Sequence, residues 1–314
     1  MFKVEKVAYG RFNAHRLVDT SNGRFLEVLS DFGAGINDLG ITNSDGNTVS
    51  VLSGYRSEDD IRLLHHTKFA GSKLSPIPNR TVDGQFQFNG QDYQFSVNEF
   101  GNRNQLHGLL HNVKFEEQKV VESDEKALLE LKHGYLGTAQ GFPFSYTVSI
   151  IYTLNVSGVE IKTVIDNTGS IDMPIGDGWH PYFKFENLNE VELHMGAAER
   201  VSSLVNNPLK PVHGFENASL IGELALDDCF KVSESNDKFN VRLKDARRGL
   251  EFSLWQTIGE GQYKYCQIYT PPSRKEIAIE PVSCPPNALN TKDSIVVLSV
   301  GQSNELSIGI NFNS

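Results

Sequence analysis

Residues 144–154 have the sequence Phe-Ser-Tyr-Thr-Val-Ser-Ile-Ile-Tyr-Thr-Leu, and this stretch decides the fold class of the chain. Large apolar residues occupy every even position, while Ser and Thr occupy most odd positions. Alternate side chains of a strand point to opposite faces of a sheet, so the stretch predicts a strand with one buried face. The same alternation recurs over residues 159–165, 250–254 and 296–312.

Turn and helix signals agree with a chain built mainly of strands. Asn89-Gly90 lies between two short runs of alternating aromatic residues and suits a type I′ hairpin turn, because both central residues need positive φ. Ser57, followed by three acidic residues, predicts the cap of a short helix that ends at Leu64. Sustained helical periodicity is lacking elsewhere. We therefore expect an all-β protein of many, mostly antiparallel strands with few short helices.

Length and composition are typical of a folded globular chain. The protein has 314 residues, of which 39% are hydrophobic and 22% are charged. No block rich in Ser, Gly or one charge divides the sequence, and no fixed-period repeat is evident. We therefore expect a single domain over residues 1–314.

Charge and cysteine content argue against several classes of protein. The chain has 29 Lys and Arg against 39 Asp and Glu, a formal charge of −10, whereas nucleic-acid-binding domains are usually basic. Clusters of five basic residues and runs of 18 apolar residues are both missing, so we expect neither nucleic-acid nor membrane partners. The first residues lack the apolar region of a secretory signal, and Cys229, Cys266 and Cys284 are widely spaced. These features predict a cytoplasmic protein with reduced thiols.

Four segments carry polar residues that a plain sheet does not need, and the first is Ser75-Pro-Ile-Pro-Asn-Arg80. Pro76 and Pro78 favour a stiff, extended backbone, which would aim Asn79 and Arg80 into a cleft. The alternative is a proline-rich loop with a solvated Arg.

The second segment, residues 102–112, is dense in amide, Arg and His side chains, which suit a ligand with many hydroxyl groups. His107 and His111 have the spacing of two zinc ligands on a helix. However, Gly108 occupies the position where zinc proteases carry their general base, so we expect no metal here. A structural hydrogen-bonding role is the alternative for His107.

The third segment is Trp179-His-Pro-Tyr-Phe183. In an extended chain His180 and Tyr182 share one face, while Trp179 and Phe183 share the other. The apolar pair would anchor the strand in the core, and the polar pair would face the cleft. A buried histidine with satisfied hydrogen bonds is the alternative.

The fourth segment contains Glu280 between Ile279 and Pro281. Ile277 and Ile279 would point into the core, so Glu280 would point away from it, and Pro281 would end the strand ladder. A carboxylate at a strand end, before a proline-stiffened loop, is well held for proton transfer. An exposed Glu at a strand end is the alternative.

Two smaller features suit a sugar ligand. The neighbouring acids Asp227 and Asp228 lie beside apolar residues, although such a pair often forms a solvated turn. In residues 263–269 the odd positions would place three Tyr side chains and Gln267 on one face. Aromatic rings stack on the C–H face of a sugar, while Gln and Asp hold its hydroxyl groups.

Together these segments resemble the aldose 1-epimerase (galactose mutarotase) family over most of the chain, in the order of the family's motifs. The motifs are Asn79-Arg80, Asn-x-Leu-His107-Gly, His180-Pro-Tyr-Phe, Asp227 before Cys-Phe, Gln267-Ile-Tyr-Thr, and Ile-Glu280-Pro. The resemblance implies a large antiparallel β-supersandwich and one epimerase-like domain. It also implies residue roles, with Glu280 as catalytic base, His180 as catalytic acid, and substrate contacts from Asn79, Arg80, His107, Tyr182, Asp227 and Gln267.

The activity implied by the resemblance is mutarotation of a free hexose such as galactose or glucose, without a cofactor or a metal. Glu280 would take the anomeric proton and His180 would protonate the ring oxygen. An ordinary Glu, with a pKa of about 4.3, is ionised at neutral pH, and a neighbouring carboxylate would favour the charged form of His180. The partner would be a small sugar, and the protein a monomer or a homodimer.

Three other functions remain open at this point. A hexose-6-phosphate mutarotase would need cations near the cavity, for which Lys73, Arg80 and Arg103 are candidates. A glycosidase or lyase would need a second carboxylate beside Glu280, for which Asp227 is the candidate. A non-catalytic carbohydrate-binding module would need the aromatic and amide groups alone. The preferred sugar and the choice between Asp227 and Asp228 also stay open.

Overall fold

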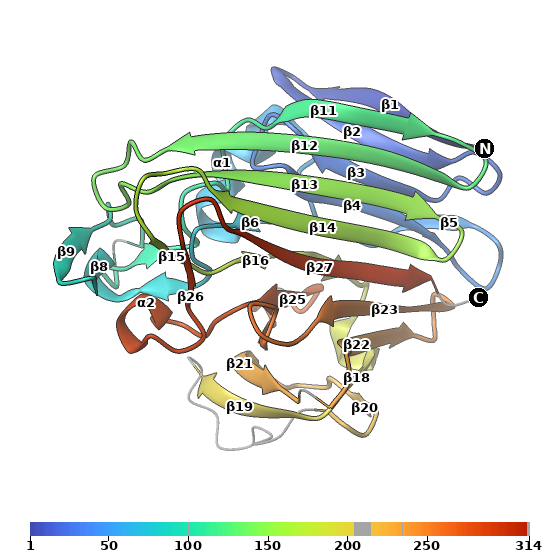
Figure 1. The fold of residues 1–314 in the computed structure, drawn as a ribbon. Coiled ribbons are helices and arrows are strands. Elements are labelled where there is room, and N and C mark those ends of the chain that lie inside the picture. Colours follow the sequence, from blue (N-terminus) through green and yellow to red (C-terminus); the bar gives the residue numbers. More distant parts are fainter. Residues whose placement is uncertain (100, 204–214, 234, 313–314) are drawn as a thin grey trace.

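The computed structural model describes residues 1–99, 101–203, 215–233 and 235–312. Strands dominate this part of the chain, which confirms the predicted all-β class (Figure 1). The helical elements described are α1 (Glu58–Lys68), α2 (Ala288–Thr291) and the 3₁₀ turns η1 (Val82–Gly84) and η2 (Leu188–Glu190).

Three large sheets form the body of the fold. The five-stranded sheet follows chain order, with β1 (Phe2–Tyr9), β2 (Phe12–Asp19), β3 (Phe25–Leu29), β4 (Gly35–Thr42) and β5 (Thr48–Ser50). The order in the nine-stranded sheet is β11 (Glu116–Glu122), β12 (Lys126–Leu136), β13 (Ser145–Asn155), β14 (Gly158–Asn167), β27 (Ser303–Phe312), β23 (Leu250–Thr257), β22 (Lys238–Asp245), β18 (Glu192–Met195) and β20 (Ser219–Leu220). Strands β1 and β2 contact β11, β12 and β13, so these two sheets pack together (Figure 1).

The third sheet has seven strands. Its order is β19 (Ala198–Ser203), β21 (Asp227–Val232), β24 (Tyr265–Tyr269), β25 (Glu276–Val282), β16 (Gly178–Trp179) and β6 (Lys73–Leu74), and β17 (Tyr182–Lys184) also pairs with β25. Three two-stranded ribbons complete the described fold: β7 (Arg80–Thr81) with β10 (Gln105–Leu106), β8 (Gln85–Phe88) with β9 (Gln91–Gln94), and β15 (Met173–Ile175) with β26 (Val296–Leu298).

The stretch that decided the fold class forms β13, which pairs antiparallel with β12 on one side and β14 on the other. Its even-numbered side chains from Tyr146 to Leu154 are buried, as the period of two predicted. They join one continuous core with side chains of the five-stranded sheet, such as Leu26, and of the seven-stranded sheet, such as Ile279. Burial of these apolar faces against one another stabilises the layered arrangement.

The hairpin prediction is confirmed and one strand prediction is corrected. Asn89 and Gly90 have φ of 48° and 76° and connect β8 to β9. The alternating stretch 296–312 forms two strands instead of one, because Gly301, with φ of 76°, lies in a turn between them. Strand β26 pairs with β15, whereas β27 lies between β14 and β23.

Helix α1 begins where predicted but ends four residues later. The Ser57 hydroxyl accepts a hydrogen bond from the Asp60 N–H at 3.1 Å, as expected of an N-cap. The predicted end at Leu64 is wrong because His65, one turn after Ile61, is buried on the same face of the helix. Phe69 then ends the helix in the left-handed conformation.

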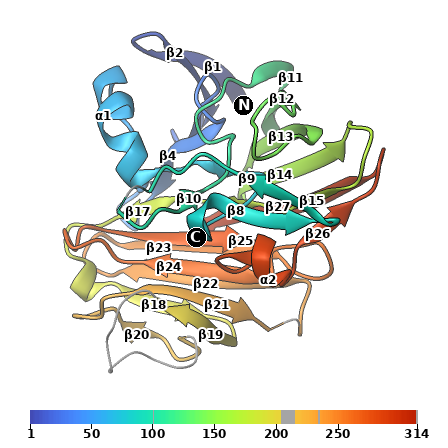
Figure 2. The same ribbon diagram turned by 90° about the vertical axis from the view of Figure 1, so that its left-hand side faces the viewer.

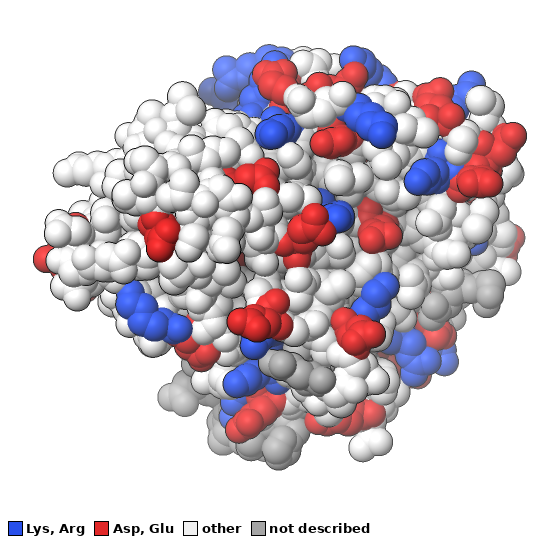
Figure 3. All heavy atoms as spheres, in the orientation of Figure 1, with Lys and Arg blue, Asp and Glu red and all other residues white. Residues whose placement is uncertain are grey.

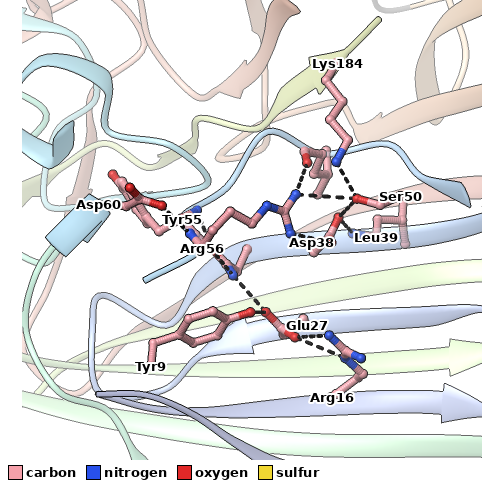
Figure 4. A network of polar contacts seen from close by, with 12 residues as sticks. Tyr9, Arg16, Glu27, Asp38, Leu39, Ser50, Tyr55, Arg56, Asp60 and Lys184 are labelled. Atoms are coloured by element: carbon pink, nitrogen blue, oxygen red, sulfur yellow. Dashed lines mark hydrogen bonds and ion pairs between the residues drawn. The ribbon is translucent and has the colours of Figure 1, made fainter. Parts of the chain in front are cut away.

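A polar network attaches the start of α1 to the five-stranded sheet. The guanidinium of Arg56 donates to Asp38 at 2.8 Å, and its backbone N–H donates to Asp60 (Figure 4). In the same view the fully buried Glu27 accepts hydrogen bonds from Tyr9 and Arg16. The two contacts of Arg56 join the start of the helix to the sheet, and the far end of the helix lies on the same side of the molecule as β17 (Figure 2).

Charges of both signs are mixed on the surface shown in Figure 3. On the face shown in Figure 3, Lys and Arg are interspersed with Asp and Glu and do not gather into a basic patch. Within the described ranges, no helix combines the length and the apolar character needed to cross a membrane.

Candidate active site

One cavity of about 340 Å³ brings together all eight residues singled out from the sequence. The seven-stranded sheet supplies Tyr182 from β17, Asp227 from β21, Gln267 from β24 and Glu280 from β25. Strand β24 also supplies Tyr269, and His180 lies between β16 and β17. The rest of the wall comes from the end of α1 and from β7, β10 and the loops around them. In sequence order, the lining side chains are His66, Thr67, Lys68, Phe69, Asn79, Arg80, Glu99, Leu106, His107, His180, Tyr182, Asp227, Gln267, Tyr269 and Glu280.

His180 and Glu280 face each other in this cavity. The distance from His180 Nε2 to Glu280 Oε1 is 3.5 Å, and both side chains are almost fully buried. The backbone of His180 is held by hydrogen bonds with Gly71 and Ser72, and its ring stacks on that of Tyr182 with centroids 4.9 Å apart. The shared face of His180 and Tyr182 agrees with the sequence pattern. The arrangement gives two titratable groups at proton-transfer range with fixed orientations.

Burial decides the protonation of this pair and corrects the charge state expected from sequence. It raises the pKa of Glu280 well above its usual value, and Asp227 adds to the rise while Arg80 opposes it. Burial lowers the pKa of His180 to about 3, and the charge of Lys68 contributes to this decrease. Both shifts favour the neutral forms, in which Glu280 carries a proton and His180 is uncharged. The expected stabilisation of a charged His180 by its neighbouring carboxylate is outweighed by desolvation.

Glu280 lies within a strand and not at its end, so the expectation that Pro281 ends the ladder is wrong. Strand β25 continues to Val282, which pairs with Tyr265 of β24 and Gly178 of β16. The N–H of Ile279 points to the carbonyl of Pro181, so the nitrogen of Pro281, two residues on, faces the same side. On that side the partner changes from β17 to β16, so the ladder tolerates the missing N–H.

Asn79 and Arg80 enter the cavity from a turn. The stiff, extended backbone predicted for this segment is incorrect in shape, because the Ser75–Pro76 peptide is cis and Asn79 has φ of 57°. The Asn79 side-chain oxygen accepts from the Arg80 N–H at 2.8 Å, a local bond that supports the left-handed conformation. Both side chains nevertheless line the cavity, as predicted.

His107 is fixed against the same turn. Its Nδ1 accepts from the Asn79 N–H at 3.3 Å, and its ring lies between those of Phe69 and His180, with centroid separations of 4.8 and 5.1 Å. Burial lowers its pKa well below the usual value, so the ring is neutral. His111 has a different partner: its Nδ1 lies 2.8 Å from Nε2 of His65. His107 and His111, the two histidines of the second segment, therefore lie in different surroundings.

The acids of β21 point to opposite sides of the sheet. Asp227 lines the cavity and accepts a hydrogen bond of 2.7 Å from Gln267 Nε2. Asp228 is buried away from it, with Arg200 at 3.9 Å. Of the aromatic face expected over residues 263–269, Tyr269 lines the cavity, while Tyr263 and Tyr265 are buried elsewhere.

Several lining residues were missed by sequence reasoning. Glu99 precedes the polar segment 102–112 without any motif of its own, and Lys68 and Phe69 fall beyond the predicted end of the helix. A longer helix prediction would have found the last two. Two cations proposed for phosphate binding lie elsewhere: Lys73 is fully buried 2.5 Å from Asp177, and Arg103 is exposed beside Asp83.

Comparisons with known proteins agree with the geometry. A model of the aldose 1-epimerase family matches residues 16–311. The chain is 28% identical over 253 residues to the uncharacterised protein YihR of Escherichia coli strain K12. This alignment covers 76% of this chain and 78% of that protein. A galactose mutarotase-like protein of Clostridium acetobutylicum has a similar structure, with a TM-score of 0.83 at 19% identity, covering 100% of this chain and 98% of the other. A GalM/aldose epimerase homologue of Caenorhabditis elegans aligns with a TM-score of 0.78 at 17% identity, over 99% of both chains. These similarities confirm the predicted fold.

Proposed function

The chain belongs to the aldose 1-epimerase family, and from this membership we propose that it interconverts the α and β anomers of a free hexose such as galactose or glucose. The observation that carries the proposal is the buried contact of 3.5 Å between His180 Nε2 and Glu280 Oε1 in a cavity lined by hydrogen-bonding groups. We also propose that residues 1–314 form one epimerase domain, which the extent of the family match supports.

The reaction needs one proton to leave the anomeric hydroxyl and another to reach the ring oxygen. The reactive form of the pair is a Glu280 carboxylate with a protonated His180, produced when the shared proton moves from Glu280 to His180. Glu280 then accepts the proton of the anomeric O1 while His180 donates its proton to O5, and the bond between C1 and O5 breaks. Each positioned proton transfer contributes a factor of about 10² to 10⁴ to the rate.

Closure of the ring reverses these transfers on the other face of the carbonyl. After rotation about the C1–C2 bond, O5 attacks C1 as His180 takes back the O5 proton, and Glu280 returns its proton to O1. The pair ends with the same single shared proton that it had at the start. Mutarotation by this route consumes no other reactant.

The remaining lining residues would hold the sugar. Asn79, Arg80, His107, Asp227 and Gln267 offer donors and acceptors for hydroxyl groups. The rings of Tyr182 and Tyr269 offer an apolar surface for its C–H bonds. A free hexose is favoured over a hexose 6-phosphate because Lys73 and Arg103, two of the three cations considered for phosphate, do not line the cavity.

Polarimetry of freshly dissolved α-D-galactose and α-D-glucose tests the proposal. We expect the protein to speed equilibration without changing its endpoint, and Glu280→Gln and His180→Asn each to lose most of kcat. The same assay with glucose 6-phosphate distinguishes a phosphosugar epimerase. Full activity of Glu280→Gln would remove Glu280 from the role of base. Binding of a sugar without any acceleration would indicate a carbohydrate-binding module.

A further inference from the structure

Arg80 reaches the cavity with its guanidinium already bound by an acid. Its Nε lies 3.1 and 3.0 Å from the two carboxylate oxygens of Glu99, and its Nη2 lies 2.8 Å from Oε1. Both residues line the cavity, and their side chains are 25% and 18% exposed. A fork of this kind fixes the plane of the guanidinium and offsets its charge within a partly buried site.

Glu99 is itself held in place for this contact. The side-chain N–H of Asn104 donates to Glu99 Oε2 at 2.7 Å, and the Glu99 N–H donates to the Asn104 carbonyl at 3.0 Å. Although burial opposes it, hydrogen bonds from Arg80 and Asn104 hold the pKa of Glu99 below its usual value. The carboxylate is therefore ionised at neutral pH, and its position does not depend on a bound sugar.

The other cation of the cavity wall is matched in the same way. Among the described residues that line the cavity, the Lys and Arg residues are Lys68 and Arg80. Lys68 Nζ lies 2.7 Å from Glu276 and 2.9 Å from the hydroxyl of Ser53. The wall also contains the acid Asp227. An anionic substituent on a sugar would thus meet paired cations and a further acid.

We propose that Glu99 is a specificity-determining residue that restricts the site to uncharged sugars by neutralising Arg80. This inference rests on the proposed sugar-binding function of the cavity. With its charge balanced, Arg80 donates hydrogen bonds to hydroxyl groups, while Glu99 largely offsets the attraction of its charge for a carboxylate or phosphate group on the sugar. A neutral sugar loses little binding affinity through this arrangement, whereas an anionic sugar is repelled by the negative charge of Glu99.

The test compares two sugars that differ at C6, D-galactose and D-galacturonate, by isothermal titration calorimetry. The wild-type protein should bind galacturonate at least about tenfold more weakly than galactose, and Glu99→Gln should reduce that ratio by about tenfold. The Gln side chain keeps an acceptor for Asn104 and nearly the same shape. If Glu99 had only a structural role, Glu99→Gln would weaken the binding of both sugars alike and leave the ratio of their affinities unchanged.

Two further variants identify the source of the effect. Glu305→Gln removes the same charge from a surface pair with Lys162, so it controls for net charge and should not alter the ratio. Arg80→Met added to Glu99→Gln should abolish the gained affinity for galacturonate. Equal binding of both sugars by the wild-type protein, or an unchanged ratio in Glu99→Gln, would overturn the inference.

Failure of the proposed function can be recognised separately. Polarimetry with galactose reports on that function, whereas binding of inorganic phosphate reports on Glu99 without any sugar. Glu99→Gln should bind phosphate more tightly than the wild-type protein, and the added Arg80→Met should remove this binding. Phosphate affinity equal in the wild-type protein and Glu99→Gln would contradict the inference even if mutarotation were observed.

Discussion

Asp177 and Ser283 are joined by two hydrogen bonds of 2.8 Å, from the Asp177 N–H to the Ser283 hydroxyl and from the Ser283 N–H to the Asp177 carbonyl. Asp177 lies three residues before His180, and Ser283 lies three residues after Glu280. The two segments that carry the candidate acid and base are therefore tied together beside the pair. The Asp177 carboxylate is in turn paired with Lys73, whose ammonium lies 4.4 Å from the ring centre of Trp179.

Loss of the Lys73 charge should strongly destabilise the protein. Lys73→Met would leave the carboxylate of Asp177 buried without its cation, which typically costs about 3–5 kcal/mol. We expect a decrease of that size in the free energy of unfolding, measured by urea denaturation and circular dichroism. The double variant Lys73→Met/Asp177→Asn should recover much of the loss because no charge remains. A single variant within about 1 kcal/mol of the wild type would contradict the expectation.

The pH dependence of kcat should report on the charges around Glu280. In the proposed mechanism the pair of His180 and Glu280 is active while it holds one proton, so the rate should fall at high pH once that proton leaves Glu280. Asp227 raises the pKa of Glu280, so Asp227→Asn should lower this pKa and move the alkaline limb to lower pH. Arg80 lowers the pKa of Glu280, so Arg80→Met should move the limb in the opposite direction. Polarimetry at saturating sugar measures both, and shifts in the same direction would argue against Glu280 as the titrating group.

Acid should destabilise the fold through the histidines behind the cavity. Mainly because of burial, the pKa of His65 is lowered to about 3 and that of His111 to about 4. Unfolded histidines titrate near pH 6.5, so the unfolded chain binds more protons than the fold between these values. This contribution to stability is complete above about pH 6.5 and is lost as the pH falls towards 3.

Comparison of variants isolates that contribution from other titrating groups. His65→Gln should show a smaller fall in the free energy of unfolding between pH 7 and pH 4.5 than the wild type, measured by urea denaturation at each pH. His194→Gln, on β18 and only half-buried, is a matched control that should retain the wild-type slope. Identical slopes in the wild type and His65→Gln would show that His65 does not titrate as expected.

The cap of α1 should influence both stability and sugar binding. Ser57→Ala removes the acceptor of the Asp60 N–H and should lower the free energy of unfolding by about 1 kcal/mol. Because Lys68 and Phe69 line the cavity at the other end of the helix, we also expect a higher KM at unchanged kcat. Ser57→Asp, which restores a capping oxygen, should return both values towards the wild type. A change in kcat alone would separate the helix from substrate binding.

The fold and most of the candidate site could be predicted because their signals are local. The alternation in β13 depends on neighbouring residues, and each motif around Asn79, His107, His180 and Glu280 is contained in a few positions. Lys68 and Glu99 lack such signals, because their role depends on which distant segments fold against them. The sequence pattern predicts too short a helix α1, because a polar residue, His65, is buried through contacts that periodicity does not reveal.

Charge states were also beyond local reasoning. The neighbours of Glu280 and His180 could be anticipated, but their desolvation depends on the whole cavity wall. Likewise, a proline usually ends a strand ladder. At Pro281, however, the neighbouring strand changes from β17 to β16, so the ladder tolerates the missing N–H. Tertiary context therefore reversed two expectations that were sound for isolated segments.

The position of Glu280 on an inner strand has an evolutionary consequence. Strand β25 is paired on both sides, while Asn79, Arg80, Glu99 and His107 lie on or beside the short β7–β10 ribbon. Loops tolerate substitution and insertion better than central strands do. Under the proposed function, substitutions in that ribbon and its loops can change which sugar is bound, while the proposed proton-transfer residue Glu280 stays fixed on a paired strand.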